Sequence, residues 1–592
     1  MTALSGPFPR DRRPSPWRWL STRLWWMEHA FERARASGKV VDDTRLRIFF
    51  VLALFTFAFL TLGLAATKAA LLSGLGHESD EVAPMAGARA DLVDRNGRIL
   101  AVDLVHYGLY IDPRDVSDRQ ATQMALLAAL PQASPARLTK ILAGSRQEYL
   151  IGGLTPEVRA KVHDLALPGV SFEDELGRDY PLGETAAHVI GFASSDGAGL
   201  AGAERAFDGQ IRAQAGKAPV ALSIDLRVQG ALQDELDNAA AHFGVLDGAG
   251  MVVNVRTGEI LAMASYPAFD PNAPGKASPW AMVNHAAATD YEPGSVFKVF
   301  TLAMGLDSGV TDVYRKFDVH TPLALPGQTI HDYDKGDRIL PLWEVFTHSS
   351  NIGAARMALL AGGDRMERYW RAFGLYRAAP SQLIESARPL VPRRMTDNVI
   401  ASMAFGHSIS VTPLTVATGM SAILNGGIYR PLTLTKLEPG EAPSPGRQVI
   451  QPATSRTMLN LMRLNVTNGT GRSANVVGYR VGGKTGTATK LVNGRYNTGK
   501  KNLASFAAVF PTDGPLDRDR YYVLIMMDEP QDLPETGGFL TGGVISAPIA
   551  GRVIERIAPM LGVRRAAAVG DEIVPGKSRD DIDFSILTAG QP

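Results

Sequence analysis

The chain has 592 residues, 45% of them hydrophobic, with 61 Lys or Arg against 60 Asp or Glu and no cysteine. That length allows about three or four domains of ~150 residues, and the composition is that of an ordinary globular protein. The net charge of +1 gives no reason to expect a nucleic-acid partner. The absence of cysteine excludes disulfides, thiolate metal sites and a cysteine nucleophile.

An uncharged apolar run near the N-terminus predicts a membrane-spanning helix over residues 48–67. At 1.5 Å per residue, such a run matches the ~30 Å hydrocarbon core of a bilayer. Residues 1–47 hold ten Lys or Arg and five acidic residues, which favours a cytoplasmic tail and an external remainder. The alternatives are a buried core helix, which the length disfavours, and a cleaved signal peptide, which would have a shorter apolar core nearer the start.

Residues 68–220 are expected to form a mixed, elongated domain, called the pedestal below. Asn96-Gly97 between two apolar pairs predicts a tight hairpin. A further strand is expected over 107–112, and helices over 124–130, 136–143 and 156–165. The pedestal has no cluster of acid, base and nucleophile, so we expect its role to be that of a spacer or a docking domain and not a catalytic one. His188 has an apolar context and no spaced partner ligands, which favours a packed histidine over a metal ligand.

Residues 221–562 alternate strands and helices, which predicts an α/β or α+β catalytic domain. Helices are expected over 226–241, 342–360 with a break at 348–351, 413–424 and 546–558, and strands over 250–255, 258–264, 479–487, 504–510 and 521–527. The final residues, 563–592, contain glycine, proline and mixed charges and are expected to be a disordered tail.

The segment from Tyr291 to Phe300 places a serine and a lysine three residues apart, where a Pro-Gly turn enters an apolar run. Residues three apart share one face of a helix, so the Lys298 amine can lie beside the Ser295 hydroxyl and take its proton. For this segment taken alone, a solvated serine and lysine at a helix start is the simpler alternative.

Two further short motifs follow in chain order. Ser349–Asn351 lies in the predicted helix break, and Lys484–Thr487 lies on a predicted strand. Together with the single Ser-x-x-Lys at Ser295, they resemble the three motifs of the serine acyl-transferase fold shared by penicillin-binding proteins and β-lactamases. The resemblance implies that fold for the catalytic domain, preceded by the membrane helix and the mixed α+β pedestal.

The resemblance also implies roles for the first two motifs. Ser295 attacks a carbonyl carbon and forms an acyl-enzyme. Lys298 takes the serine proton, which requires a neutral amine, and both burial and the charge of Lys484 would favour that form. Ser349 relays a proton to the leaving amine, and Asn351 holds the substrate amide.

The third motif is expected to bind substrate. Lys484, Thr485 and Thr487 would hold a terminal carboxylate by charge and hydroxyl groups. Gly486, which has no Cβ, would let a substrate backbone come close. The backbone N–H groups of Ser295 and Thr487 would form the oxyanion hole, the first helped by its place at a helix N-terminus. No cofactor and no metal is expected.

Blocks outside the motifs resemble the class B penicillin-binding proteins. RADLVDRNGRILA from Arg89 and RDYPLGETAAHVIGF from Arg178 are similar to their pedestal, and ASFAAVFP, IMMDEP and GGVISAP are similar to the division-specific branch, penicillin-binding protein 3 or FtsI. The resemblance covers roughly residues 45–560. Ala90 replaces a usual glycine and His285 an expected arginine, departures that concern local packing and leave the motif side chains intact.

That branch implies septal peptidoglycan D,D-transpeptidation. The enzyme is acylated by a D-Ala-D-Ala stem peptide, releases D-Ala and passes the acyl group to an amine of a neighbouring stem. β-Lactam antibiotics would bind covalently to the same serine. The implied partners are a polytopic membrane glycan polymerase and other division proteins, and the implied location is the cytoplasmic membrane at the septum, with the catalytic domain outside.

Three alternatives stay open at this point. An elongation-type class B penicillin-binding protein would carry the same motifs. A β-lactamase is usually a smaller, soluble chain with an added base that activates water. A penicillin-sensing receptor needs a signalling domain across the membrane, and a tail of 47 residues is short for a separate core.

Overall fold

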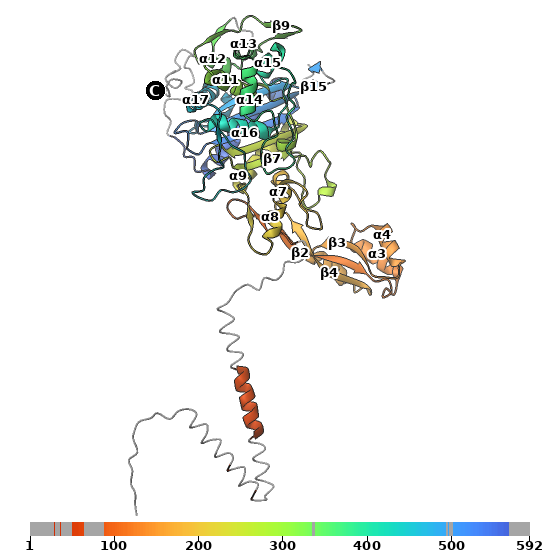
Figure 1. Cartoon of the computed structure of the whole chain (residues 1–592). Coiled ribbons are helices and arrows are strands. Elements are labelled where there is room, and N and C mark those ends of the chain that lie inside the picture. Colours follow the sequence, from red (N-terminus) through yellow and green to blue (C-terminus); the bar gives the residue numbers. More distant parts are fainter. Residues whose placement is uncertain are drawn as a thin grey trace, which may run out of the picture. The chain divides into compact units, whose positions relative to one another are not determined.

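The computed structural model describes residues 50–63, 88–333, 338–492, 495–496 and 501–566, together with His29 and Ala36 (Figure 1). The chain divides into two compact units, residues 1–83 and residues 84–592.

In the first unit, a helix covers residues 50–63, and every one of these residues is exposed. Among the described residues, no helix is both long enough and apolar enough to cross a membrane. The other residues of the predicted span, 48–49 and 64–67, lie outside the described residues, as does the predicted tail 1–47 except for its two described positions.

The long strand β2 (Ile99–Ile111) organises the pedestal. Its first residues pair with β1 (Leu92–Val93), its remaining residues pair with β4 (Val170–Asp179), and from Tyr107 onward it also pairs with β3 (Glu148–Leu154). All three pairings are antiparallel, whereas β1 runs parallel to β5 (Val220–Ala221). The strand predicted over 107–112 is therefore the second half of a longer one, because β2 has partners along its whole length.

The predicted hairpin between β1 and β2 is confirmed. Gly97 has a φ of +81°, and the Asp94 N–H donates to the Arg98 carbonyl across the turn. The Asp94 carboxylate accepts the N–H groups of Asn96 and Arg98, so side-chain and backbone bonds fix the same turn. The pedestal helices are α3 (Arg119–Ala129), α4 (Pro135–Leu142), α5 (Pro156–His163), α6 (Ala187–Ile190), α7 (Gly202–Ala206) and α8 (Asp208–Ala213).

A buried ionic cluster joins the pedestal blocks that the sequence singled out. The Arg89 guanidinium donates to Glu204 and Asp208, and that of Arg178 donates to Glu204 and Asp103. The Glu204 side chain is fully buried and lies 2.7 Å from Arg178. Removing one partner of such a cluster leaves a buried charge uncompensated, which explains why these blocks carry charged residues inside a packed region.

The catalytic domain is built on a five-stranded antiparallel sheet in the order β14-β17-β18-β6-β7. Its strands are β6 (Asp247–Asn254), β7 (Ile260–Tyr266), β14 (Gly482–Thr489), β17 (Asn502–Phe510) and β18 (Tyr521–Asp528). Strand β14, which carries the third motif, lies at one edge. The strand predicted over 479–487 begins three residues later, after a glycine at 478 with a φ of +82°.

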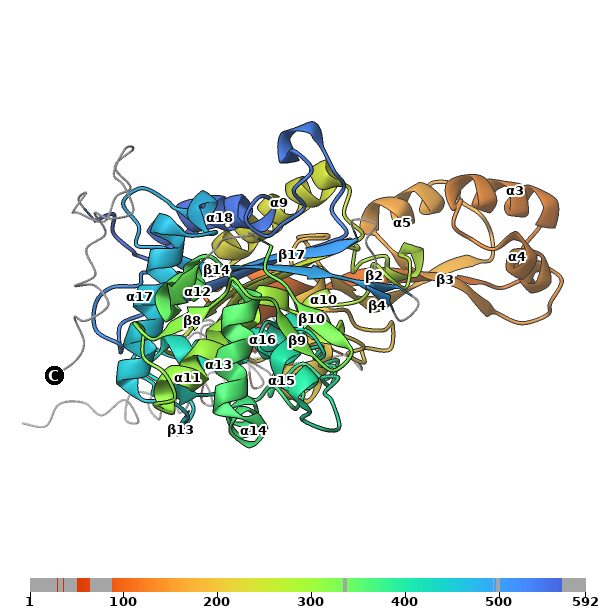
Figure 2. The ribbon, with the colours of Figure 1, turned by 90° about the horizontal axis from the view of Figure 1, so that it is seen from above.

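Helices cover both faces of this sheet, as Figure 2 shows. Helices α9 (Leu226–Phe243) and α18 (Ser546–Met560) pack on one face. The larger core, on the other face, contains η2 (Gly294–Phe297), α11 (Lys298–Asp307), α16 (Pro413–Leu424) and α17 (Pro452–Asn468). The remaining helices are α10 (His285–Ala288), α12 (Leu342–Thr347), α13 (Asn351–Ala361), α14 (Gly363–Ala372) and α15 (Asp397–Met403).

Short strands and 3₁₀ turns complete the domain. The strands are β8 (Lys316–Asp318), β9 (Leu323–Leu325), β10 (Gln328–Ile330), β11 (Ile339–Pro341), β12 (Ile428–Tyr429), β13 (Arg447–Gln448), β15 (Leu491–Val492) and β16 (Arg495–Tyr496). The turns are η1 (Pro274–Lys276), η3 (Arg472–Ala474) and η4 (Pro534–Thr536).

Two further expectations can be compared with the structure. His188 is buried, its Nε2 lies 2.8 Å from the Ala281 carbonyl, and burial lowers its pKa to about 4, so the packed histidine is confirmed. Of the predicted tail, residues 563–566 are described, and the Ala566 N–H donates to the Gly478 carbonyl. Residues 567–592 lie outside the described residues.

Candidate functional site

The nucleophile segment consists of Tyr291 to η2. Gly294 has a φ of +57°, and its N–H donates to the carbonyl of Gly406, whose φ is +82°. A Cβ on Gly406 would lie 2.2 Å from the Gly294 carbonyl oxygen, so the two backbones touch. Ser295 lies in the 3₁₀ turn η2 and Lys298 is the first residue of α11, so the two do not share one α-helix as predicted. Their side chains still face each other.

Lys298 connects the first two motifs. Its Nζ lies 3.0 Å from Ser295 Oγ, 3.2 Å from Ser349 Oγ and 2.7 Å from Asn351 Oδ1. The residue is fully buried, and burial lowers the pKa of its amine to about 7, opposed by the negative charge of Asp332. A lysine with such a pKa is neutral in a large fraction of molecules near pH 7, as a general base must be.

The second motif occupies the predicted helix break, which is confirmed between α12 and α13. Ser349 has a φ of +57°, a conformation that residues with a Cβ rarely adopt. This turn directs its hydroxyl toward both lysines, since Lys484 Nζ donates to the same oxygen at 2.9 Å. Ser350 caps α13 by accepting the Gly353 N–H, so the strained residue precedes a well-anchored helix start.

Asp332 holds the second motif, and sequence reasoning missed it. Its carboxylate accepts the Asn351 and Ile352 N–H groups at 2.5 and 2.9 Å, and the Ser350 hydroxyl at 2.5 Å. An anion at a helix N-terminus is favourable because it meets unpaired N–H groups and the positive end of the helix dipole. No local sequence pattern links a residue after β10 to a helix that starts nineteen residues later, so this contact could not be predicted.

Lys484, predicted to bind a substrate carboxylate, is fully buried in the structure. Its Nζ contacts Ser349 Oγ, the Thr485 carbonyl and Thr485 Oγ1, and its side chain is fully buried. Burial first, and the charge of Lys298 second, hold the pKa of Lys484 well below its usual value. Burial thus lowers the pKa of both lysine amines, and both contact the Ser349 hydroxyl.

The structure gives a different reason for the glycine at 486. A Cβ there would lie 2.2 Å from Ser505 Oγ, 2.8 Å from Val296 Cγ2 and 2.9 Å from the Pro293 carbonyl oxygen. The absence of a Cβ therefore lets the nucleophile segment pack on β14. An added Cβ would point toward that segment and not toward an incoming substrate. Packing at this point brings the first motif against the third.

The two threonines of the third motif have partners from other segments. Thr485 Oγ1 lies 2.7 Å from Thr470 Oγ1, and the fully buried Asn465 holds the turn before Thr470 through its side-chain oxygen. The hydroxyl of Thr487 accepts the Gly542 N–H at 3.2 Å. Thr470 and Gly542 were not predicted, because they reach β14 only through the tertiary fold.

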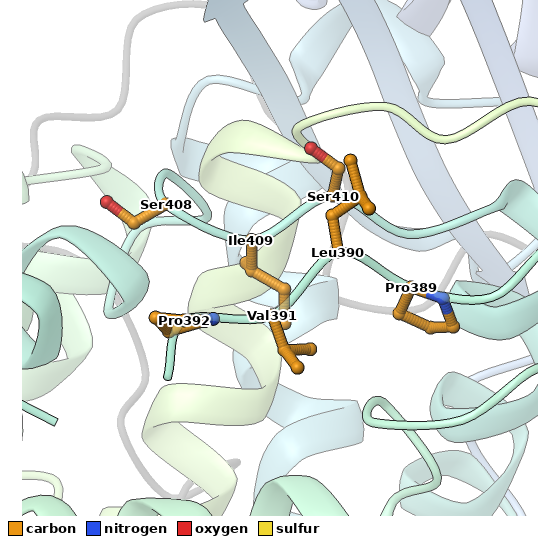
Figure 3. Close-up of a pocket in the computed structure, with 7 residues that line it drawn as sticks. All are labelled: Pro389, Leu390, Val391, Pro392, Ser408, Ile409 and Ser410. Atoms are coloured by element: carbon orange, nitrogen blue, oxygen red, sulfur yellow. The ribbon is translucent and has the colours of Figure 1, made fainter. Parts of the chain in front are cut away.

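The structure has a groove of about 430 Å³, whose lining residues are drawn in Figure 3. Its lining comes from two chain segments, residues 389–392 and 408–410. The two segments are joined by the bridge between Leu390 and Ser410, and the Ser408 N–H donates to the Glu292 carboxylate. None of the predicted site residues lines the groove. Within the part of the chain that the structure describes, no group of three or more His, Asp or Glu could hold a metal.

Comparison with protein families gives two matches. The penicillin binding protein transpeptidase domain matches residues 248–555, and the penicillin-binding protein dimerisation domain matches residues 84–237. Together they cover the described pedestal and the catalytic sheet.

Curated relatives match along most of the chain. The chain is 51% identical over 556 residues to the probable peptidoglycan D,D-transpeptidase FtsI of Caulobacter vibrioides, covering 93% of this chain and 94% of the relative. It is 33% identical over 504 residues to the peptidoglycan D,D-transpeptidase FtsI of Escherichia coli K12, covering 79% and 82% of the two chains.

A solved structure shares the fold. The crystal structure of penicillin-binding protein 3 from Mycobacterium tuberculosis, complexed with aztreonam, matches with a TM-score of 0.62 at 23% identity, covering 81% of this chain and 97% of that chain. At that identity the match supports the fold alone.

Proposed function

This chain belongs to the penicillin-binding protein transpeptidases of the division-specific FtsI type, and on that premise we propose the following site and mechanism. Its activity is peptidoglycan D,D-transpeptidation during cell division, and it binds penicillin. The observation that carries the site assignment is the position of Lys298 Nζ, within hydrogen-bonding distance of Ser295, Ser349 and Asn351.

Acylation begins when Ser295 Oγ attacks the carbonyl carbon of the penultimate D-Ala. The neutral amine of Lys298, 3.0 Å away, takes the hydroxyl proton as the new C–O bond forms. Ser349 contacts both lysines and relays a proton to the departing amine as the C–N bond breaks. The products are an acyl-enzyme on Ser295 and free D-Ala, and no cofactor enters the step.

Transfer reverses these proton movements. The amine of a second stem peptide attacks the acyl carbon and gives its proton to Ser349, which passes a proton to Lys298. Lys298 returns a proton to Ser295 Oγ as the Ser295 C–O bond breaks. Asn351 and the third motif hold the donor: Asn351 binds a substrate amide, and Lys484, Thr485 and Thr487 bind its terminal carboxylate. Gly486 contributes by letting β14 lie against the nucleophile segment. The oxyanion hole consists of the N–H groups of Ser295 and Thr487.

We also propose that the chain is anchored in the membrane by an N-terminal helix. Residues 50–63 form a helix that is exposed throughout and free of charged residues, and residues 1–47 are basic. A cytoplasmic N-terminus and an external catalytic domain follow from the positive-inside rule. The proposed membrane helix ends near residue 67, the pedestal near 220 and the catalytic domain near 562. A polytopic glycan polymerase and division proteins are the proposed partners. Protease added to intact spheroplasts should digest the catalytic domain and spare an N-terminal tag. Protection of the catalytic domain would contradict the proposed topology.

The site assignment is tested by covalent labelling. Fluorescent penicillin should label the wild-type chain, and mass spectrometry should place the adduct on the peptide that contains Ser295. Ser295→Ala should abolish labelling while the circular dichroism spectrum stays unchanged, and persistent labelling would refute the nucleophile. Rapid, repeated turnover of a chromogenic cephalosporin would instead identify a β-lactamase.

A further inference from the structure

The nucleophile segment is fastened to the sheet four residues before Ser295. The Tyr291 hydroxyl donates to Asp247 Oδ1 at 2.6 Å, and both side chains are buried. The Tyr291 backbone forms two hydrogen bonds with Val411. Hydrogen bonds to a carboxylate are among the stronger ones in proteins, so Tyr291 is held both by its backbone and by its side chain.

Asp247 stands at one end of a row of cross-strand neighbours that leads to the third motif. In register, Asp247 of β6 opposes Asp528 of β18, Asp528 opposes Leu503 of β17, and Leu503 opposes Ala488 of β14. Neighbouring strands lie ~4.8 Å apart, so the row spans about 14 Å. Ala488 directly follows Thr487, and the row therefore connects the Tyr291 anchor to the strand residue that supplies one oxyanion donor.

The other end of the nucleophile segment contacts β14, the strand that carries Thr487. A Cβ on Gly294 would lie 2.8 Å from the Thr487 carbonyl oxygen and 3.3 Å from the Ala488 Cβ. The segment is thus fixed by Tyr291 at one end and by its contact with β14 at the other. Ser295 directly follows Gly294, and Thr487 is itself the contacted residue, so the separation of their N–H groups depends on how the segment sits on the sheet.

From this geometry we infer that Tyr291 is a positioning residue for the oxyanion hole, with its hydroxyl, bound by Asp247, fixing the spacing between the Ser295 and Thr487 N–H groups. The inference rests on the proposed function, since it assumes the acyl-transfer chemistry at Ser295. Tyr291 acts through the segment and does not touch the reacting atoms.

The charges around Asp247 keep this anchor in place. Asp247 and Asp528 face each other on adjacent strands, where like charges repel. Lys490, the first residue after β14, donates to Asp528 at 2.6 Å and to Glu529 at 3.0 Å, and Lys501 donates to Glu529 at 2.8 Å. Two lysines thus offset most of the negative charge, which leaves the Asp247 carboxylate available to Tyr291.

Tyr291→Phe tests the inference because it removes only the hydroxyl. With the full-length protein in detergent and a fluorescent penicillin, stopped-flow measurements separate the acylation rate constant from the dissociation constant of the pre-acylation complex. Acylation should slow about tenfold, less than the ~10²–10³-fold loss that follows removal of an oxyanion donor itself. The midpoint of thermal unfolding should fall, because the buried Asp247 carboxylate loses its donor. The dissociation constant should stay unchanged, and a loss of rate without a loss of affinity separates positioning from general loosening.

Tyr522→Phe is the matched control. Tyr522 lies on β18 in the same core and is fully buried, and its hydroxyl has no hydrogen-bond partner among the residues that the structure describes. The substitution therefore makes the same chemical change without removing an anchor, and the acylation rate should equal that of the wild type. An equal loss of rate in Tyr522→Phe would overturn the inference, because any buried hydroxyl would then have the same effect.

Variants of the acceptor supply an independent readout. Asp247→Asn keeps an oxygen that can accept the Tyr291 hydroxyl, so its acylation rate should stay near that of the wild type. Asp247→Ala removes the acceptor and should slow acylation as much as Tyr291→Phe. Combining Tyr291→Phe with Asp247→Ala should add nothing, since both remove the same contact.

Failure of the inference and failure of the proposed function look different. An unlabelled Ser295 in the wild-type chain would refute the acyl-transfer site itself. The positioning role alone would be overturned if the wild type is labelled normally and Tyr291→Phe has an unchanged acylation rate. It would also be overturned if the effects of the two substitutions multiply in the double variant.

Discussion

The side-chain nitrogen of the fully buried Lys298 lies 3.0 Å from the hydroxyl of Ser295, which is half-buried. This pair is the chemical centre of the site, because burial lowers the lysine pKa to about 7 and so makes a base of a residue that is otherwise a cation.

The rate of acylation should rise with pH through about 7 and then level off. Only the neutral amine of Lys298 accepts the serine proton, and its fraction grows as pH passes its pKa of about 7. Acylation by fluorescent penicillin, timed from pH ~5 to ~9, measures this profile. A rate that is already maximal near pH 5 would contradict the role of Lys298 as the base.

Asp332→Asn should move this profile to lower pH. The negative charge of Asp332 raises the Lys298 pKa, so its removal lowers the pKa further and lets the base act in more acidic solution. The asparagine oxygen can still accept the N–H groups at the start of α13, so the maximal rate should change little. Asp332→Ala should shift the profile equally and, because it also removes these bonds, should lower the maximal rate. An unshifted profile in Asp332→Asn would contradict the electrostatic role.

Lys484→Ala should slow acylation by carboxylate-bearing β-lactams about tenfold or more, the equivalent of one charge-assisted hydrogen bond. Its Nζ contacts Ser349 Oγ and Thr485, so the lysine also supports the proton relay. A matched β-lactam with an esterified carboxylate separates the two effects. An equal loss of rate on the acid and on the ester would contradict carboxylate binding by Lys484.

Gly486→Ala should impair acylation, because its Cβ would press on Val296 and on the Pro293 carbonyl oxygen and push β14 away from the nucleophile. Gly230→Ala is the matched control. Gly230 lies in α9 with nothing within 4 Å of an added Cβ, and the substitution should stabilise the helix by about 0.5–1 kcal/mol. Comparable labelling kinetics in both variants would show that the close contact at Gly486 is dispensable.

Asp528→Asn should stabilise the protein at pH ~8 by about 2–3 kcal/mol. Burial, and then the charge of Asp247, raise the pKa of Asp528 from 3.8 to about 6. The folded state therefore binds a proton more tightly than the unfolded state, and ionised Asp528 costs stability above about pH 6. The gain in the thermal midpoint should shrink as pH falls from about 6 to below about 4; a gain independent of pH would contradict this cause.

Much of the fold followed from local patterns. The Asn96-Gly97 hairpin, the break at Ser349 and the helix over 413–424 were all predicted and are present. Boundaries moved where long-range pairing decided them: β2 extends back to Ile99 because β1 and β4 pair with its first half.

The sequence by itself determined the chemistry, since the identity, order and spacing of Ser295, Ser349 and Lys484 define the three motifs. Only the tertiary structure decided how that chemistry is tuned. Burial sets the pKa of Lys298, and Asp332 meets Ser350 across eighteen residues. The Asp247 anchor for Tyr291 comes from a strand forty-four residues away. Periodicity shows which face of an element a residue occupies, but packing alone determines which distant side chain that face meets.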